Sequence, residues 1–122
     1  MNQPYAISYE PLFRTLELMD LAALVDQPHP AWWNQTLIQV DGTAVRLGVF
    51  EGEYHWHRHE KEDEFFLVLT GRIEIELEGS EPVVLEPLQA FCVPAGRPHR
   101  PVARVRSAVL MLERVGIVAT GD

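Results

Sequence analysis

Hydrophobic and polar residues alternate with a period of two through most of the chain after residue 35. The clearest case is residues 72–78, where Ile73, Ile75 and Leu77 alternate with charged side chains. This period places alternate side chains on opposite faces of a strand, so that one face packs inward and the other meets solvent. The pattern predicts strands at residues 36–40, 43–50, 53–59, 64–70, 72–78, 83–85, 90–93, 98–103 and 105–113.

Turn residues separate these segments. Asp41-Gly42 predicts a hairpin turn, and Gly71 and the pair Gly79-Ser80 each follow a strand. Many short strands at regular spacing with turn residues between them are typical of an all-β sandwich or barrel. The chain has 122 residues, which is the length of one ordinary domain. We therefore expect a single all-β domain.

The first part of the chain follows a different pattern. Residues 1–14 contain two prolines and are expected to be extended and irregular. Residues 15–25 carry an approximate helical stripe and predict one short helix, whereas two further prolines predict a loop at 26–34. The chain is thus expected to divide into an N-terminal extension with a short helix, 1–35, and a barrel, 36–122.

Composition limits the partners and the compartment. The net charge is −8, with 18 acidic against 10 basic residues, and no run of Lys or Arg could track a phosphate backbone. Nucleic acid and anionic membranes are therefore poor partners. No apolar stretch is long enough to cross a bilayer, and the N-terminal residues do not resemble a secretory signal, so a cytoplasmic location is expected. The single cysteine, Cys92, lies in an apolar run and is expected to be buried.

The candidate chemistry lies in two short segments, HWHRHEKEDE at 55–64 and VPAGRPH at 93–99. They offer three imidazoles and one carboxylate, a mixture of donors that suits a divalent first-row transition ion such as Mn, Fe, Co, Ni or Zn. A structural zinc site usually relies on thiolates, which this pattern lacks. The candidate ligands are His57, His59, Glu64 and His99.

The expected strands indicate how these side chains could meet. His57 and His59 are two residues apart and would share one face of a strand, and Glu64 would begin the next strand after a tight turn. His99 would come from a distant strand that barrel closure directs inward. A His-x-His pair alone is more often a surface or core feature than a ligand pair, so the hypothesis depends on all four residues together. Asp63 could compete with Glu64, but alternation directs it to the opposite face.

The segment from Gly52 to Gly71 resembles the first motif of the cupin superfamily, written G-x5-H-x-H-x3,4-E-x6-G. His57, His59 and Glu64 occupy the histidine and glutamate positions of that motif. The spacing differs only in the first gap, which is one residue shorter than in the motif.

A second segment resembles the other cupin motif, G-x5-P-x-G-x2-H-x3-N. Pro94, Gly96 and His99 match it at the correct spacing. Leu88 and Ala103 stand where the motif has glycine and asparagine. Those two positions are usually structural, so the departures leave the candidate ligands intact.

The resemblance implies a small double-stranded β-helix, the cupin or jelly-roll barrel, with an ion held near one end by the four candidate ligands. The chain is most similar to the small single-domain cupins labelled mannose-6-phosphate-isomerase-like. That label follows from fold and motifs and does not identify a reaction. Cupins often dimerise, so the resemblance also implies a homodimer in which Trp32, Trp33 and the N-terminal segment could cover a barrel edge or the partner.

Other residues are expected around the ion. His55 could be a catalytic base or an outer hydrogen-bond partner, or a rim histidine without a role. Arg97 could pair with a carboxylate or phosphate of a ligand, or be a solvated turn residue. Phe66, Val68 and Met111 are expected to line the pocket and keep it apolar.

Four protein ligands leave two positions of an octahedral ion for water or a small oxygen-rich molecule, and open positions are typical of catalytic sites. The leading hypothesis is a metal-dependent enzyme, either an oxygenase or an isomerase or lyase, with a small-molecule ligand. The alternative is a cupin module that binds a small ligand or a metal without turnover. A scaffold that acts only by dimerising is a third hypothesis, which the intact ligand set disfavours.

Overall fold

The computed structural model describes residues 5–122, and the expectation of an irregular start at residues 1–4 lies outside the described residues. Strands are the main regular element of the described chain, together with one short helix and several irregular segments. The elements are β1 Tyr5–Ser8, α1 Leu21–Asp26, β2 Trp32–Val40, β3 Thr43–Glu53, β4 Glu64–Thr70, β5 Ile73–Leu77, β6 Val83–Leu85, β7 Ala90–Val93 and β8 His99–Arg114.

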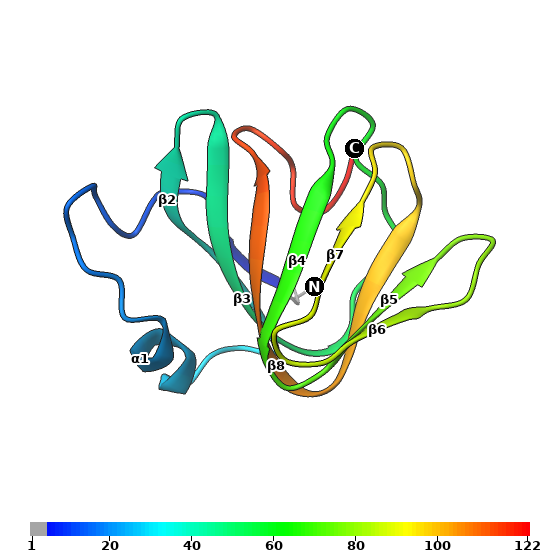
Figure 1. Cartoon of the computed structure of the whole chain (residues 1–122), viewed down its shortest axis with the longest axis horizontal. Coiled ribbons are helices and arrows are strands. Elements are labelled where there is room, and N and C mark those ends of the chain that lie inside the picture. The colour runs from blue at the N-terminus through cyan, green and yellow to red at the C-terminus, as the bar shows by residue number, and fades with distance from the viewer. Residues whose placement is uncertain (1–4) are drawn as a thin grey trace.

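The strands form one curled sheet in the order β1-β2-β3-β8-β4-β7, with the β5–β6 hairpin joined to β8. Figure 1 shows the sheet wrapping around a common interior, with α1 on the extension at one side. The ladder does not close on itself among the described strands. The expected all-β double-stranded β-helix with a short N-terminal helix is confirmed. No helix in residues 5–122 has the length and hydrophobicity that crossing a membrane would require.

β8 organises the fold. It is a single strand of 16 residues, where the sequence predicted two strands at 98–103 and 105–113. It pairs with β3 along most of its length, with β5 near its start and with β4 near its end. Residues 104–106 are exposed where β8 bends between these partners, at the bottom of Figure 1. The strand can therefore deliver residues from both of its ends to the interior.

The N-terminal part differs from the sequence-based prediction in two ways. Residues Tyr5–Ser8 form β1, which pairs in parallel with β2, and β2 begins at Trp32 inside the predicted loop. Trp32 is buried, so burial of its side chain on the sheet outweighs the loop signal of the preceding prolines. The helix is shorter than predicted because it starts after Asp20, whose side chain accepts the Ala23 N–H at 3.2 Å.

The predicted strand at 53–59 is wrong, and this difference matters most for the site. β3 ends at Glu53, and residues 54–63 form no strand; their one β-bridge among the described residues joins His57 to His99. The Tyr54 N–H donates to the Pro101 carbonyl and the His57 N–H donates to the His99 carbonyl. Residues 54–57 therefore lie opposite the shorter span 99–101, which leaves one extra residue on the side of the segment. This irregular pairing ends the simple alternation of faces.

The core fills the space inside the curl. Phe66, Val68, Ile73 and Met111 are among its members, and each is at least 98% buried. Cys92 was expected to be buried but is exposed, because it lies on the outward face of the edge strand β7.

Candidate metal centre

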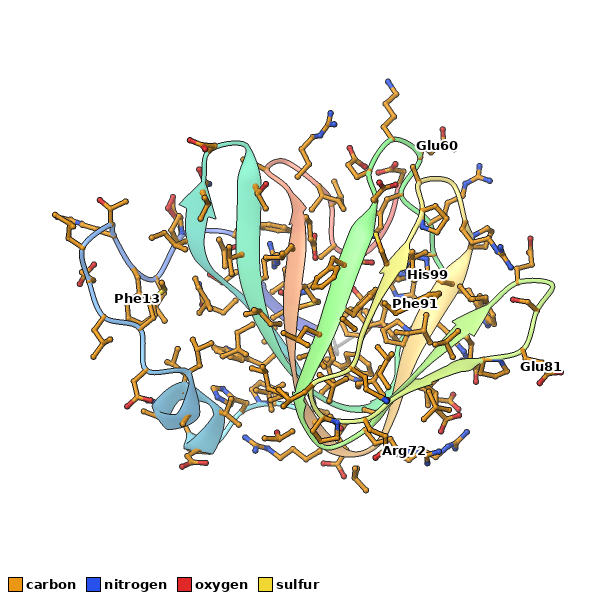
Figure 2. The ribbon with its side chains drawn as sticks, in the orientation of Figure 1. Phe13, Glu60, Arg72, Glu81, Phe91 and His99 are labelled. Atoms are coloured by element: carbon orange, nitrogen blue, oxygen red, sulfur yellow. The ribbon has the colours of Figure 1, made fainter. Side chains whose placement is uncertain are left out.

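The four candidate ligands come together at one end of the curled sheet. One donor atom from each of His57, His59, Glu64 and His99 lies within 4.8 Å of the others. His57 and His59 lie on the irregular segment 54–63, whereas Glu64 and His99 are the first residues of β4 and β8. Figure 2 shows His99 inside the curl, below the rim loop that carries Glu60.

The main chain joins two of these elements directly. The His57 N–H donates to the His99 carbonyl at 3.0 Å, and the His99 N–H donates to the His57 carbonyl at 2.9 Å. This reciprocal pair places the two rings 4.4 Å apart between centroids. The pair explains how residues more than forty positions apart reach one point without a closed barrel.

Backbone carbonyls hold two of the rings in the orientation that a metal needs. Nδ1 of His57 lies 3.1 Å from the His55 carbonyl, and Nδ1 of His99 lies 2.8 Å from the Arg97 carbonyl. A carbonyl can only accept, so each Nδ1 carries the proton and each Nε2 keeps a lone pair. The Glu64 Oε1 atom lies 3.0 Å from Nε2 of His99 and 3.5 Å from Nε2 of His59.

His59 provides a test of whether a metal fits. Its side chain is 98% buried, yet Nδ1 has no hydrogen-bond partner within residues 5–122, and Nε2 has only the Glu64 carboxylate at 3.5 Å, too long for a good hydrogen bond. Leaving a buried polar group unpaired costs about 1–3 kcal/mol. A divalent ion bound among three imidazoles and one carboxylate would give His59 a partner and match the donor preference of first-row transition metals. The residues therefore fit a metal ion.

Burial and neighbouring charges place these groups in the protonation state that binds metals. Burial, together with the charge of His99, lowers the pKa of His57 to about 4. Burial alone would raise the pKa of Glu64, but the interactions with His59 and His99 hold it well below its usual range. The centre therefore presents a neutral His57 and an ionised Glu64 at neutral pH.

We expect the metal-free protein to lose stability as the pH falls from about 6.5 to about 4. The pKa of His57 lies at about 4 in the fold, whereas that of a histidine in an unfolded chain is about 6.5, so in this window the unfolded chain binds the proton and the folded chain does not. The depressed pKa of Glu64 acts in the same direction, because protonating this carboxyl removes stability that its ionised form contributes. Thermal melts in a chelator, recorded across this range, measure the slope.

The variant His57→Gln should show a shallower loss of melting temperature with acid than the parent. The matched control is His29→Gln, because His29 stacks on Trp33 away from the cluster. Equal slopes for the parent and for His57→Gln would contradict the assignment.

A small cavity of about 20 Å³ adjoins the ligands. That space is about enough for one water molecule. Phe66 and Met111 line it, together with Trp32, Phe50 and Tyr54. Val68, which was expected to share this role, is fully buried in the core and does not border the cavity.

On a regular strand Tyr54 and His57 would face opposite ways, but Tyr54 is buried and its ring centroid lies 5.1 Å from that of His57. The irregular segment 54–63 explains this, because the two residues no longer alternate as they would on a strand.

The other predicted site residues lie at the periphery. Arg97 donates to the Glu78 carbonyl at 2.8 Å and to the Ser80 hydroxyl at 3.0 Å, so its guanidinium ties down the β5–β6 turn. His55 is exposed, and its Nδ1 and Nε2 lie 2.9 Å from the Tyr5 hydroxyl and 2.7 Å from the Thr120 carbonyl. These contacts join the segment 54–63 to β1 and to the C-terminal residues.

Asp63, the possible competitor of Glu64, lies outside the cluster. Its carboxylate accepts the Ala95 N–H at 2.9 Å. The carboxylate therefore joins the rim loop to the turn that precedes β8, and Glu64 remains the carboxylate that meets the three imidazoles.

The C-terminal segment, residues 115–122, is a part of the site that sequence reasoning missed. The Tyr54 hydroxyl donates to the Ala119 carbonyl at 3.1 Å, and the Asp122 N–H donates to the Arg58 carbonyl at 3.0 Å. In Figure 1 this segment dips from the end of β8 toward the middle of the molecule and rises again beside the rim loop. An irregular segment has no periodic pattern in its sequence, so only the folded structure shows that residues 115–122 lie beside the metal centre.

Glu113 is a second missed residue. It is 97% buried on β8 and lies directly opposite Glu64 in the β4–β8 register. Burial and the neighbouring Glu64 raise its pKa well above the usual range, which favours the protonated carboxyl group. In the sequence, Glu113 follows Val109 and Met111 at a spacing of two residues, so an acid stands at a position expected to face inward.

Comparison with known proteins places these features in a family. Residues 44–113 match the family model of the cupin domain. The chain is 34% identical over 97 residues to the uncharacterized protein YdbB of Bacillus subtilis (strain 168). The aligned residues cover 80% of this chain and 86% of that protein.

Solved structures agree with that match. A candidate mannose-6-phosphate isomerase of Ralstonia eutropha JMP134 superposes with a TM-score of 0.70 at 24% identity, over 80% of this chain and 97% of that one. A chain from the structures of the DMSP lyases RdDddP and RnDddQII superposes with a TM-score of 0.55 at 29% identity, over 63% of this chain and 40% of that one.

Proposed function

This chain belongs to the cupin family, and we propose that it is a metal-dependent enzyme acting on a small oxygen-rich molecule. The reaction centre is the cluster His57, His59, Glu64 and His99. The observation that supports the proposal is the convergence of four donors, three of them buried, of which one is an imidazole without a hydrogen-bond partner among the described residues. The proposed ion is a divalent first-row transition metal, Mn, Fe, Co, Ni or Zn, because the donors are three nitrogens and one oxygen.

Four protein ligands leave open positions on a six-coordinate ion, where the bound metal would supply Lewis-acid chemistry to a coordinated substrate. The protein's own groups define the surroundings. The carbonyls of His55 and Arg97 fix the rings of His57 and His99. His55 thus acts on the centre through its backbone, while its ring holds the flanking segments together.

The interior beside the ligands is lined mainly by apolar side chains and contains a buried acid. Phe66 and Met111 border the cavity and keep it apolar, which strengthens the electrostatic interactions inside it. Glu113 lies opposite Glu64 in the ladder, and burial and the charge of Glu64 favour a proton on its carboxyl group. A buried acid at this position can donate that proton to a negatively charged oxygen that develops on a bound substrate.

Of the two reaction classes, the lyase or isomerase branch has the better support. The support is the 29% identity to a chain solved with the DMSP lyases, which extends over 40% of that chain. An oxygenase remains the competing branch, because the same donor set also binds iron.

The test starts with elemental analysis of protein purified without chelators, followed by a panel of small hydroxy and oxo acids with and without air. We expect about one equivalent of metal and turnover that persists without oxygen. Turnover only with iron and oxygen would instead identify the protein as an oxygenase. Protein that stays metal-free when supplied with each of the five ions would refute the proposal.

The size of the cavity favours one alternative, a cupin that binds a small ligand or a metal without turnover. A cavity of about 20 Å³ admits a water molecule and no substrate until the covering side chains move. Full metal occupancy with no product from any member of the panel would support this alternative.

The homodimer and the cytoplasmic location stay predictions. Light scattering of the purified protein measures whether it is a dimer.

A further inference from the structure

A second and larger cavity lies on the same inward face of the sheet as the metal centre. Its volume is about 340 Å³, within the range of roughly 300–1,000 Å³ typical of small-molecule sites. Arg46 on β3 borders it and lies opposite Met111 of β8, which borders the metal-centre cavity, so both cavities open on one face. The floor is formed by buried Thr36, Ala44 and Arg46, and the rim includes exposed Val118 of the C-terminal segment.

The floor contains a charged group whose bonding is incomplete. Arg46 is 99% buried. Its Nε donates to Asn34 at 2.8 Å and its Nη1 donates to Thr36 at 3.0 Å, but Nη2 has no partner in the described part of the chain. No carboxylate of residues 5–122 forms an ion pair with this guanidinium. Burying a charge without a counter-ion is costly, so a ligand that supplies one is favoured.

The charge of the lining is opposite to that of the protein. The chain carries a net charge of −8, yet no Asp or Glu borders this cavity, whereas Arg46 and Arg114 both do. Most of the remaining lining is apolar, with Ile117 and Val118 from the C-terminal segment among its members. A positive anchor beside apolar walls suits a small anion with a hydrophobic body.

We propose that this cavity is a binding site for a small organic carboxylate, with the Arg46 guanidinium as its anchor. The planar fork of arginine matches the two oxygens of a carboxylate. The ring of Tyr9 lies over the guanidinium, 4.8 Å from it, and its hydroxyl accepts the Ala119 N–H at 3.1 Å, so the ring covers one face of the anchor. The apolar body then packs against Ile117 and Val118.

The site is separate from the metal centre, because the two cavities share no lining residue. The inference therefore does not rest on the proposed function. Carboxylates can also ligate metal ions, so the test must use protein with and without metal. If the protein failed to bind any metal, carboxylate binding at Arg46 would still be expected.

The probes are benzoate and its neutral counterpart benzamide, titrated by calorimetry into metal-free and metal-loaded full-length protein. We expect benzoate to bind roughly tenfold more tightly than benzamide or better in both forms, because a hydrogen bond to a charged group is worth about 1.5–3 kcal/mol. In NMR spectra, the Arg46 Nε–H and the Ile117 amide should shift and the ring signals of His57 should not. Equal binding of the two probes, or benzoate binding that requires the metal, would overturn the proposal.

Two variants locate the site. Arg46→Met keeps an unbranched side chain without the charge and should remove the preference for benzoate, whereas Arg104→Met should not, because Arg104 pairs with Glu74 on the outer surface. Should Arg46→Met fail to fold, Val118→Trp fills the exposed rim and leaves the floor intact, and it should weaken benzoate binding about as strongly. Unchanged benzoate affinity in either cavity variant would contradict the assignment, as would tighter binding of phenyl phosphate than of benzoate.

Discussion

Replacing His99 with alanine is expected to lower the affinity of the protein for Mn²⁺ and Co²⁺ by roughly 100-fold or more, because loss of a direct ligand should exceed the 10–100-fold cost of losing an outer-shell partner. His99 is 99% buried, and its Nε2 atom lies 3.0 Å from Glu64. Its Nδ1 proton is already committed to the Arg97 carbonyl, so Nε2 is the atom available to an ion. Calorimetric titration of chelator-treated protein measures the change.

The matched control is His29→Ala, which removes an imidazole that stacks on Trp33 and lies outside the cluster. Circular dichroism should confirm that both variants keep the sheet. A His99→Ala variant that folds and binds the same number of ions with the same affinity would show that the cluster is not the metal site. Loss of affinity in both variants would point to a general effect of histidine removal.

Replacing Gly71 with alanine is expected to lower the free energy of unfolding by roughly 3 kcal/mol, because backbone strain and a steric clash add together. Gly71 has a φ of 83°, a conformation that side chains rarely adopt. An added Cβ would also lie 2.7 Å from the Cα atom of Ser107, which is backbone and is held by the β8 ladder. Urea denaturation followed by circular dichroism measures the loss.

Gly79→Ala separates the two causes. Gly79 has a similar φ of 79°, but nothing lies within 4 Å of the position of an added Cβ. This variant should therefore lose only about 1 kcal/mol, the cost of the left-handed backbone. Equal losses at the two glycines would show that contact with Ser107 contributes nothing.

Three strands were predictable because short apolar runs bounded by turn residues are local patterns. Residues 64–70, 83–85 and 90–93 were predicted with the bounds that the structure has. The segment 53–59 was not, since it alternates in sequence but pairs with β8 at only isolated points. His57 and His59 still meet Glu64, because the reciprocal bridge to His99 replaces the regular strand that the sequence argument assumed.

By itself, the sequence determined the all-β class, the cupin motifs and the set of four donor residues, because periodicity, residue type and spacing are properties of neighbouring positions. Only the tertiary structure decided which buried groups lie beside those donors. Glu113 reaches Glu64 through the β4–β8 register, and the C-terminal segment covers the interior. Arg46 lies at the floor of a cavity that this segment helps to form. Each of these contacts joins residues distant in the chain, and their pairing depends on strand register and packing, which local patterns do not encode.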